Sequence, residues 1–261
     1  MSLERVVSVV RKEVREFRRN RFVIGTMAVL PFIFLITPMI TIFTIPASAS
    51  GPQVKAAVGV ISLLMLIIPI AIPPVIAAYS VVGERDQGTL EPVLTTPVRA
   101  SELLLGKAAA AFLPSVAIAY AIYLVVLISV RFGAAHVVSS VVFHPPQLLA
   151  QLLFTPLLAL WSIWIGIGIS TRASDVRVAQ QLATVASLPL LGFTSLLSFQ
   201  LIKPSVPLAI GLALALLIAD VIAWRLVSGL FDRERLITGK KASTPRQDGG
   251  LAGGQTRTHP R

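Results

Sequence analysis

The chain has 261 residues, of which 55% are hydrophobic and only 13% charged, whereas about 25% of the residues of a soluble domain are charged. This composition excludes a soluble globular protein and predicts an all-α, polytopic membrane protein with spans of about 20 residues each. The net charge of +11 is concentrated at the ends of apolar segments, which argues against a nucleic-acid partner. The absence of cysteine excludes disulfide frameworks, thiolate metal sites and cysteine nucleophiles.

The first 21 residues have the pattern of an amphipathic helix. Apolar residues recur at helical spacing, and mainly Arg, Lys and Glu fill the other positions. The apolar stripe consists of Leu3, Val6, Val7, Val10, Val14 and Phe17. Such a helix can lie in the membrane interface, with its stripe against acyl chains and its cations at anionic headgroups. We therefore predict an interfacial helix over residues 1–21 that anchors the topology, a role compatible with packing on a cytoplasmic partner.

Residues 22–228 contain six apolar segments, each long enough to cross a bilayer. They cover residues 22–45, 56–81, 103–130, 148–170, 178–199 and 206–227. We predict a transmembrane helix for each of them. Prolines within these segments are tolerated where neighbouring helices satisfy the freed backbone groups. The pair Pro73-Pro74 is the strongest candidate for a kink.

Lysine and arginine residues are distributed unequally between the two sides of the predicted bundle. Residues 1–21 hold seven of them, the two loops on the same side hold five, and the C-terminal segment holds eight. The opposite side has only Lys55, Arg131 and Lys203. Because positive residues are enriched in cytoplasmic segments, we expect a protein of the cell (cytoplasmic) membrane with both termini in the cytoplasm. Residues 229–261 are basic and rich in Gly, Pro and Thr, which predicts a disordered cytoplasmic tail.

A polar stretch of 16 residues, VGERDQGTLEPVLTTP (residues 82–97), interrupts the apolar pattern between the second and third segments. Gly88 permits a turn, and Thr89 can cap a short helix through its hydroxyl. The leucines of that helix share one face, and Pro97 ends it. A loop that only reverses direction needs about four to six residues. We interpret the stretch as a short cytoplasmic helix that contacts a second protein, and an ordinary solvated loop is the alternative.

Two motifs in this region form a longer pattern. The run Glu84-x-x-x-Gly88-Thr89-Leu90-Glu91-x-x-Leu94-x-Thr96-Pro97 is followed by Glu102-Leu-Leu-Leu-Gly106-Lys107. Together they resemble the signature of type-2 ABC exporter permeases, and the Thr-Leu-Glu-Pro version is similar to that of bacterial drug- and sodium-efflux permeases. The six segments, the N-terminal amphipathic helix and a second cytoplasmic loop, TRASDVRVAQQL, extend the resemblance as far as Lys241.

The resemblance implies a partner and a set of contact positions. In that family this loop, residues 82–102 here, carries a coupling helix that docks on a separate ATP-binding subunit. ATP-driven closure of two such subunits moves the spans between inward- and outward-facing states. The complex holds two permease subunits, identical or different, with the pathway lined largely by the second and fifth spans. The coupling positions implied for this chain are Glu84, Gly88, Thr89, Leu90, Glu91, Leu94 and Pro97.

No motif for nucleotide hydrolysis occurs in the chain. The nearest approach to G-x-x-x-x-G-K-[ST], whose backbone N–H groups hold phosphates, is Gly106-Lys107, but the first Gly and the final Ser/Thr are absent. We therefore expect no enzyme activity and no cofactor on this chain, with ATP and Mg²⁺ bound by the partner subunit. His136 and His144 share the longest external loop, which has no carboxylate, and we expect no metal site there.

Asp220 is the one evident ionisable residue inside the predicted spans. It lies about 10 Å from the cytoplasmic end of the last span at 1.5 Å per residue. A charged residue within a span is costly and points to a function. Two hypotheses remain open for it. One is structural pairing, with a nearby Arg or with the indole of Trp224 one turn later, and the other is a role in binding substrate or an ion.

The sequence thus predicts the permease subunit of an ATP-driven exporter. Its substrate would be hydrophobic or amphiphilic, such as a drug, an antibiotic or a lipid-like molecule, moved out of the cytoplasm or the inner leaflet. The nearly uncharged spans favour such cargo over an anionic polymer. An ion-coupled secondary transporter is an alternative, but it would rely on intramembrane carboxylates, histidine chains or inverted repeats. A membrane scaffold or sensor that transports nothing is a third possibility.

Overall fold

The computed structural model describes residues 3–86, 100–173, 175–199 and 205–241, and these residues form helices and short connections without any strand. The helices are α1 (Leu3–Phe17), α2 (Arg21–Thr44), α3 (Gly51–Asp86), α5 (Ala100–Gly133), α6 (His136–Val142), α7 (Pro145–Ser170), α8 (Val176–Ser198) and α9 (Val206–Lys241). The all-α prediction is therefore confirmed for this part of the chain. The short helix predicted within residues 82–102 falls largely on residues 87–99, which lie outside the described residues.

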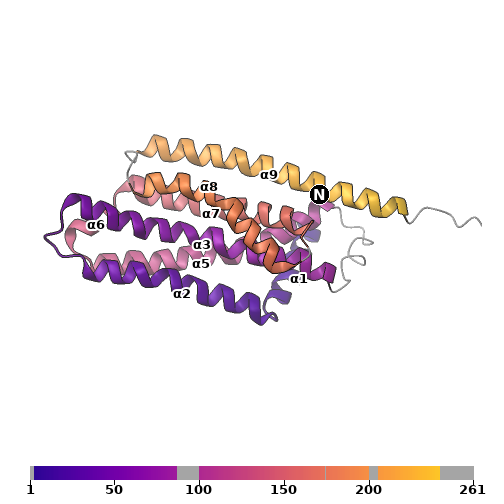
Figure 1. Ribbon diagram of the computed structural model, residues 1–261, viewed down its shortest axis with the longest axis horizontal. Coiled ribbons are helices and arrows are strands. Elements are labelled where there is room, and N and C mark those ends of the chain that lie inside the picture. Colours follow the sequence, from indigo (N-terminus) through magenta and orange to yellow (C-terminus); the bar gives the residue numbers. More distant parts are fainter. Residues whose placement is uncertain (1–2, 87–99, 174, 200–204, 242–261) are drawn as a thin grey trace, which may run out of the picture.

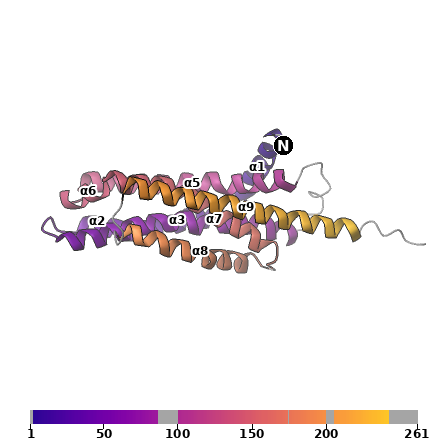
Figure 2. The same cartoon turned by 90° about the horizontal axis from the view of Figure 1, so that it is seen from above.

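The long helices run along one bundle, with α1 near one end and α6 at the other (Figure 1). We call these the α1 end and the α6 end. Helix α3 packs against α2, α5, α7 and α8, and α3 and α7 lie between α5 and α8 (Figure 2). Helix α3 is the centre of the bundle, since 72% of its apolar stretch is buried, against 22% in both α5 and α9.

Five of the described helices are long and apolar enough to cross a membrane. They contain the stretches Val23–Thr44, Gly51–Val82, Ser101–Gly133, Pro145–Ser170 and Val206–Leu230. These stretches correspond to the first four predicted segments and the sixth. The fifth predicted segment also forms a helix, α8, but its N-terminal half carries polar residues such as Gln180 and Gln181. The prediction that α8 spans the membrane stays a prediction.

The two faces of α8 differ in side-chain size. Its buried residues are small or weakly polar, namely Ala179, Ala183, Ser187, Thr194 and Ser198. Its exposed residues include Leu182, Val185 and Leu188, each at least half exposed. Small residues let helices in membranes approach closely, and large apolar residues suit contact with lipid. The distribution is therefore the one expected of a helix whose outer face meets acyl chains.

A serine on α7 satisfies a backbone group freed by a proline in α3. Pro73 has no N–H to offer the carbonyl of Pro69, four residues earlier. The hydroxyl of Ser162 lies 3.1 Å from that carbonyl oxygen and can donate to it. Gly166, one turn later on α7, allows this close contact, because a Cβ there would lie 3.3 Å from the Cα of Pro74. The expectation that a neighbouring helix satisfies the backbone at this proline pair is confirmed at Pro73.

Helix α9 extends further than the sequence predicted. The predicted last segment ends at residue 227, but the helix continues to Lys241 and passes beyond the α1 end of the bundle (Figure 1). Residues 229–241, which the sequence analysis assigned to the tail, are therefore helical. They include several good helix formers, such as Leu, Arg, Glu and Lys, which explains why the helix continues past the apolar stretch.

Candidate functional site

The predicted coupling loop connects two helices that meet at the α1 end. Helix α3 ends at Asp86 and α5 begins at Ala100, so both flanks of residues 87–99 are placed. Of the predicted coupling positions, Glu84 lies in the last turns of α3, but its side chain is outside the described part of the structure. The other six, Gly88, Thr89, Leu90, Glu91, Leu94 and Pro97, lie outside the described residues altogether. Their roles stay predictions.

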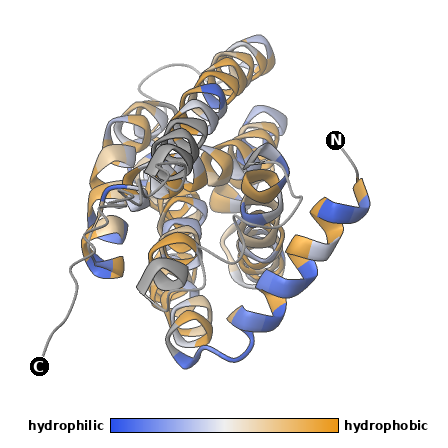
Figure 3. Cartoon of the chain, turned by 90° about the vertical axis from the view of Figure 1, so that its right-hand side faces the viewer, coloured by the Kyte–Doolittle hydropathy of each residue, from blue (hydrophilic) through white to orange (hydrophobic). Residues whose placement is uncertain are grey.

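Helix α1 lies transverse to the other helices at the edge of the bundle (Figure 3) and packs against α5. The predicted apolar stripe is split by this packing. Phe17 is buried and Val10 packs against the core, whereas Leu3, Val7 and Val14 are exposed. The prediction that the whole stripe faces acyl chains is therefore wrong for its inner half. That half faces the bundle, where it shares the buried face with a charged residue that the prediction did not consider.

That residue is Glu13, which forms a buried cluster with Lys107 of α5 and Ser80 of α3. Glu13 and Lys107 are each only 1% exposed. The Lys107 Nζ lies 2.7 Å from Glu13 Oε1 and donates to the Ser80 carbonyl oxygen at 2.8 Å. The Ser80 hydroxyl donates to Glu13 Oε2 at 2.8 Å. Both carboxylate oxygens are thus satisfied, which a buried ion pair requires because its desolvation is costly.

Two further contacts join α1 to the same end of α5. Arg5 Nη1 lies 3.6 Å from Glu102 Oε2, and the Glu102 side chain is 1% exposed. Val9 sits against Gly106, where a Cβ would lie 2.5 Å from Val9 Cγ1. Residues 5, 9 and 13 of α1 are four apart and share one face. The Gly106-Lys107 pair, which ends the second motif of the sequence analysis, therefore provides a close helix contact and a buried cation.

Sequence reasoning missed this cluster, although one signal for it exists. Glu13 follows Val6 and Val10 at helical spacing and precedes Phe17 by four residues, so it occupies an apolar position of α1. An acidic residue at such a position calls for a buried cationic partner. The identity of that partner, 94 residues away, depends on how α1 crosses α5 and is not encoded locally.

Asp220 of α9 is buried, and its side chain has no partner among the described residues. It is 3% exposed, and neither carboxylate oxygen has a hydrogen bond within the described part of the chain. The indole Nε1 atoms of Trp161 and Trp224 also lack partners there, so the pairing suggested for Trp224 is not formed. A Cβ at Gly168 of α7 would contact Val227 of α9 at 3.2 Å. Helices α7 and α9 both start at the α6 end and therefore run in the same direction. Trp161 precedes Gly168 by seven residues and Asp220 precedes Val227 by seven, so Trp161 and Asp220 lie at the same height in the bundle.

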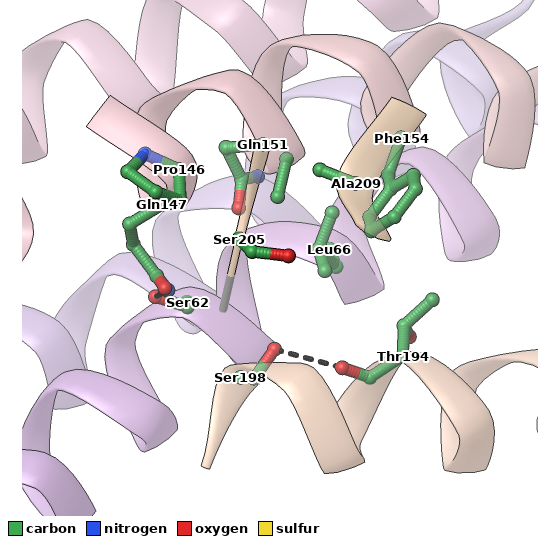
Figure 4. Close-up of a pocket in the computed structure, with 11 residues that line it drawn as sticks. Ser62, Leu66, Pro146, Gln147, Gln151, Phe154, Thr194, Ser198, Ser205 and Ala209 are labelled. Carbon is green, nitrogen blue, oxygen red and sulfur yellow. Dashed lines mark hydrogen bonds between the residues drawn. The ribbon is translucent and has the colours of Figure 1, made fainter. Parts of the chain in front are cut away.

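A small cavity lined by both polar and apolar residues lies near the α6 end (Figure 4). Its lining residues come from α3, α7, α8 and α9 and the residue before α9, and they are Ser62, Leu66, Pro146, Gln147, Ala150, Gln151, Phe154, Thr194, Ser198, Ser205 and Ala209. Gln147 Nε2 donates to Ser62 Oγ at 2.6 Å, and Ser198 Oγ donates to the Thr194 carbonyl at 3.1 Å. The cavity of about 20 Å³ has room for a water molecule. None of its lining side chains is charged.

The two histidines of the predicted external loop frame α6. His136 is the first residue of α6, and His144 is the residue before α7. Within the described ranges, no group of three or more His, Asp or Glu side chains is placed to hold a metal ion. The expectation that this loop binds no metal stays an expectation.

A family model described as ABC-2 family transporter protein matches residues 7–206, which is most of the chain. The matched region begins within α1 and ends at the first residue of α9, so it includes residues 82–102 and all three members of the buried cluster. Asp220 lies beyond it. No curated protein matches the chain.

Proposed function

Because the chain belongs to the ABC-2 family of transporter proteins, we propose that it is the permease subunit of an ATP-driven exporter. Membership of this family makes the chain a multi-pass transmembrane component of an ABC transporter. The ATPase is a separate ABC ATP-binding subunit with which the chain partners. The proposal adds the direction of transport, the composition of the complex and the class of substrate.

In the proposed orientation, the α1 end faces the cytoplasm of a cell membrane. Residues 5–21, from α1 to the start of α2, include seven basic residues. The neighbouring helix ends and the turn after α7 add Arg85, Lys107, Arg172 and Arg177. Among the described residues, the α6 end has only Lys55, near the start of α3, and Arg131, near the end of α5. The excess of positive charge at the α1 end supports this orientation.

The observation that carries the proposal is the length of the two helices that flank residues 87–99. Helices α3 and α5 have 36 and 34 residues. At 1.5 Å per residue they are about 54 Å and about 51 Å long, whereas the hydrocarbon core of a bilayer is about 30 Å thick. We therefore propose that Asp86 and Ala100, the ends of α3 and α5, lie beyond the hydrocarbon, where a soluble subunit can reach the loop that joins them. A force on these two helix ends would be transmitted along two continuous helices.

The complex would contain two ATP-binding subunits, which hold ATP and Mg²⁺, and a second permease, either another copy or a different chain. Alternating access would then move the substrate. The apolar outer surfaces and the nearly uncharged spans favour a hydrophobic or amphiphilic substrate, such as a drug, an antibiotic or a lipid-like molecule, over an anionic polymer.

The test begins with purification of the tagged full-length chain and identification of the proteins that accompany it. Proteoliposomes containing the chain with its ATPase subunit should export an amphiphilic dye when ATP is added. Charge reversal by Glu91→Lys should leave the chain in the membrane and abolish most of this ATP-dependent export. Lys55→Glu, a charge reversal at the α6 end, serves as the matched control. Unchanged export by the Glu91→Lys variant would contradict the coupling assignment.

One observation favours a second candidate, an ion-coupled secondary transporter. Asp220 is a buried carboxylate without a partner in the described part of the chain, and intramembrane carboxylates often bind coupling ions. This candidate requires transport that continues without ATP and stops when the ion gradient is dissipated. The same proteoliposomes, made without the ATPase subunit and with a proton or sodium gradient, separate the two mechanisms.

A further inference from the structure

We infer that Glu13, Ser80 and Lys107 form a positioning cluster that makes α1 move together with the ends of α3 and α5 next to residues 87–99. We call the connection of α1 to α3 and α5 through these three residues the joint, and it is a property of the structure. Its use in transport, as the route by which displacement of residues 87–99 reaches α1 and then α2, rests on the proposed function.

The hydrogen bonds of the cluster form a closed ring among its three residues. Lys107 Nζ contacts the Glu13 carboxylate at 2.7 Å and two oxygens of Ser80 at 2.8 Å and 3.0 Å. Ser80 returns a hydrogen bond to the other carboxylate oxygen at 2.8 Å. Each member therefore contacts both of the others, and they come from three different helices. Loss of one charged partner would leave the other charge buried and uncompensated, which is strongly destabilising.

The cluster is placed symmetrically with respect to the loop. Ser80 is six residues before the end of α3 at Asp86, and Lys107 is seven residues after the start of α5 at Ala100. At 1.5 Å per residue, both are about 10 Å from the points where the chain leaves the helices. The cluster thus joins the two flanks to each other as well as to α1. A displacement that moves both flanks has to move Glu13.

The path continues from α1 into the first span. Residues 18–20 are all that separates α1 from α2, and the Asn20 side chain caps α2 by accepting from the Val23 N–H at 3.2 Å. Helix α2 packs against α3 and α5, so it already contacts the helices that flank the loop. Movement of α1 would therefore reach α2 through this short connection.

An apolar anchor would not behave in the same way. If α1 were held only by its valines, it could slide or rotate at little cost, because apolar contacts are not directional. A buried ion pair with three directional hydrogen bonds has one satisfactory arrangement, which fixes the register of one helix on another. The exposed residues Leu3, Val7 and Val14 remain free to contact lipid while the opposite face is fixed.

The joint can be tested in the permease alone, reconstituted in nanodiscs, by electron–electron distance measurement between two spin labels. The chain has no cysteine, so Arg11→Cys on α1 and Phe132→Cys at the far end of α5 introduce the only labelling sites. Both positions are exposed. The doubly labelled chain without further substitutions is the parent, and it should give one narrow distance distribution. The Lys12→Met control, which removes an exposed lysine 3.7 Å from the Glu13 carboxylate, should give the same result.

Lys107→Met should broaden or shift that distribution. The double variant Glu13→Leu with Lys107→Met removes both buried charges, so it should insert normally, and it should broaden the distribution as well. A narrow, unshifted distribution in the inserted double variant would overturn the inference. This result does not depend on any ATPase subunit.

The second readout uses the complex with its ATPase subunit. The double variant should assemble normally but transport less substrate per ATP hydrolysed, by about fivefold or more, as expected for the loss of a typical coupling energy. Unchanged transport per ATP, together with a broadened distance distribution, would overturn the role of the cluster in transmission. If the parent chain transports without any ATPase, the proposed function fails, and the distance measurement still decides whether the joint exists.

Discussion

Substitution of Gly106 by alanine is expected to push α1 away from α5. The added Cβ would lie 2.5 Å from Val9 Cγ1 and 2.6 Å from Val9 Cβ. Carbon atoms in optimal contact are about 3.5–4.0 Å apart, so the overlap is about 1 Å. The obstructing atoms belong to a β-branched side chain next to its backbone, which has little freedom to turn aside. The helix itself therefore has to move.

A movement of this size would reach the buried ion pair. The Lys107 Nζ to Glu13 Oε1 distance of 2.7 Å would grow by about 1 Å if α1 moved directly away, beyond the usual range of a hydrogen bond. Overpacking of a well-packed contact costs about 1–3 kcal/mol. The docking of α1 should weaken by that amount, while the rest of the bundle should be unaffected.

Hydrogen exchange of the α1 amides measures this docking directly, since exchange in a locally opening segment reports its local free energy. A loss of about 1–3 kcal/mol should speed exchange of the protected α1 amides by about 5–150-fold. Amides in the centre of α3 should keep their protection and serve as the internal control.

The compensating substitution is Val9→Gly, which removes both obstructing carbons. The nearest remaining atom to the new Cβ would then be the Val6 carbonyl oxygen at 3.4 Å, an ordinary contact. In a double-mutant cycle, Gly106→Ala should therefore cost much less in the Val9→Gly background than in the parent. Equal costs in both backgrounds, or no cost in either, would refute this account of the α1–α5 contact.

Two further substitutions test buried polar groups within the bundle. Ser162→Ala should lower stability by about 1 kcal/mol, because the Pro69 carbonyl loses its donor from α7. Thermal unfolding in detergent measures this loss. The control, Ser115→Ala, should cost less, because this buried hydroxyl donates to the Ala111 carbonyl of its own helix. Asp220→Asn should keep or raise thermal stability, because it replaces a buried ionisable group, which has no partner in the described part of the chain, with a neutral side chain of the same shape. A marked fall in the melting temperature of Asp220→Asn would mean that the carboxylate has a partner in the working protein.

The helices could be located from the sequence because long apolar stretches have few alternatives to a helix in a membrane. The predicted segment 22–45 and helix α2, for example, differ by one residue at each end. The predicted segment 178–199 also forms a helix, α8, but its buried face carries Ser and Thr while its large apolar residues point outwards. Mean hydropathy averages over both faces of the helix, so it does not show that the polar residues are buried and the large apolar ones exposed.

The buried cluster could not be predicted because its members are far apart in the sequence. Glu13 and Lys107 were both visible as charged residues near an expected membrane boundary, and either could have been solvated there. Only the crossing of α1 over α5, made possible by the missing side chain at Gly106, brings them together. The sequence singled out Asp220 as an ionisable residue within a span. It could not show that Trp161 lies at the same height in the bundle, because this depends on the register of α7 against α9.

The Ser162 hydroxyl has a single proton but three carbonyl oxygens within reach, those of Pro69 at 3.1 Å, Leu158 at 2.9 Å and Ala159 at 3.0 Å. When α3 and α7 are in contact, the proton can serve Pro69, and when they separate, it can turn back to its own helix without becoming unsatisfied. The hydroxyl of Ser162 can therefore exchange an acceptor on α3 for one on α7. If α3 bends at its proline pair, the hydroxyl keeps a hydrogen-bond acceptor throughout the movement.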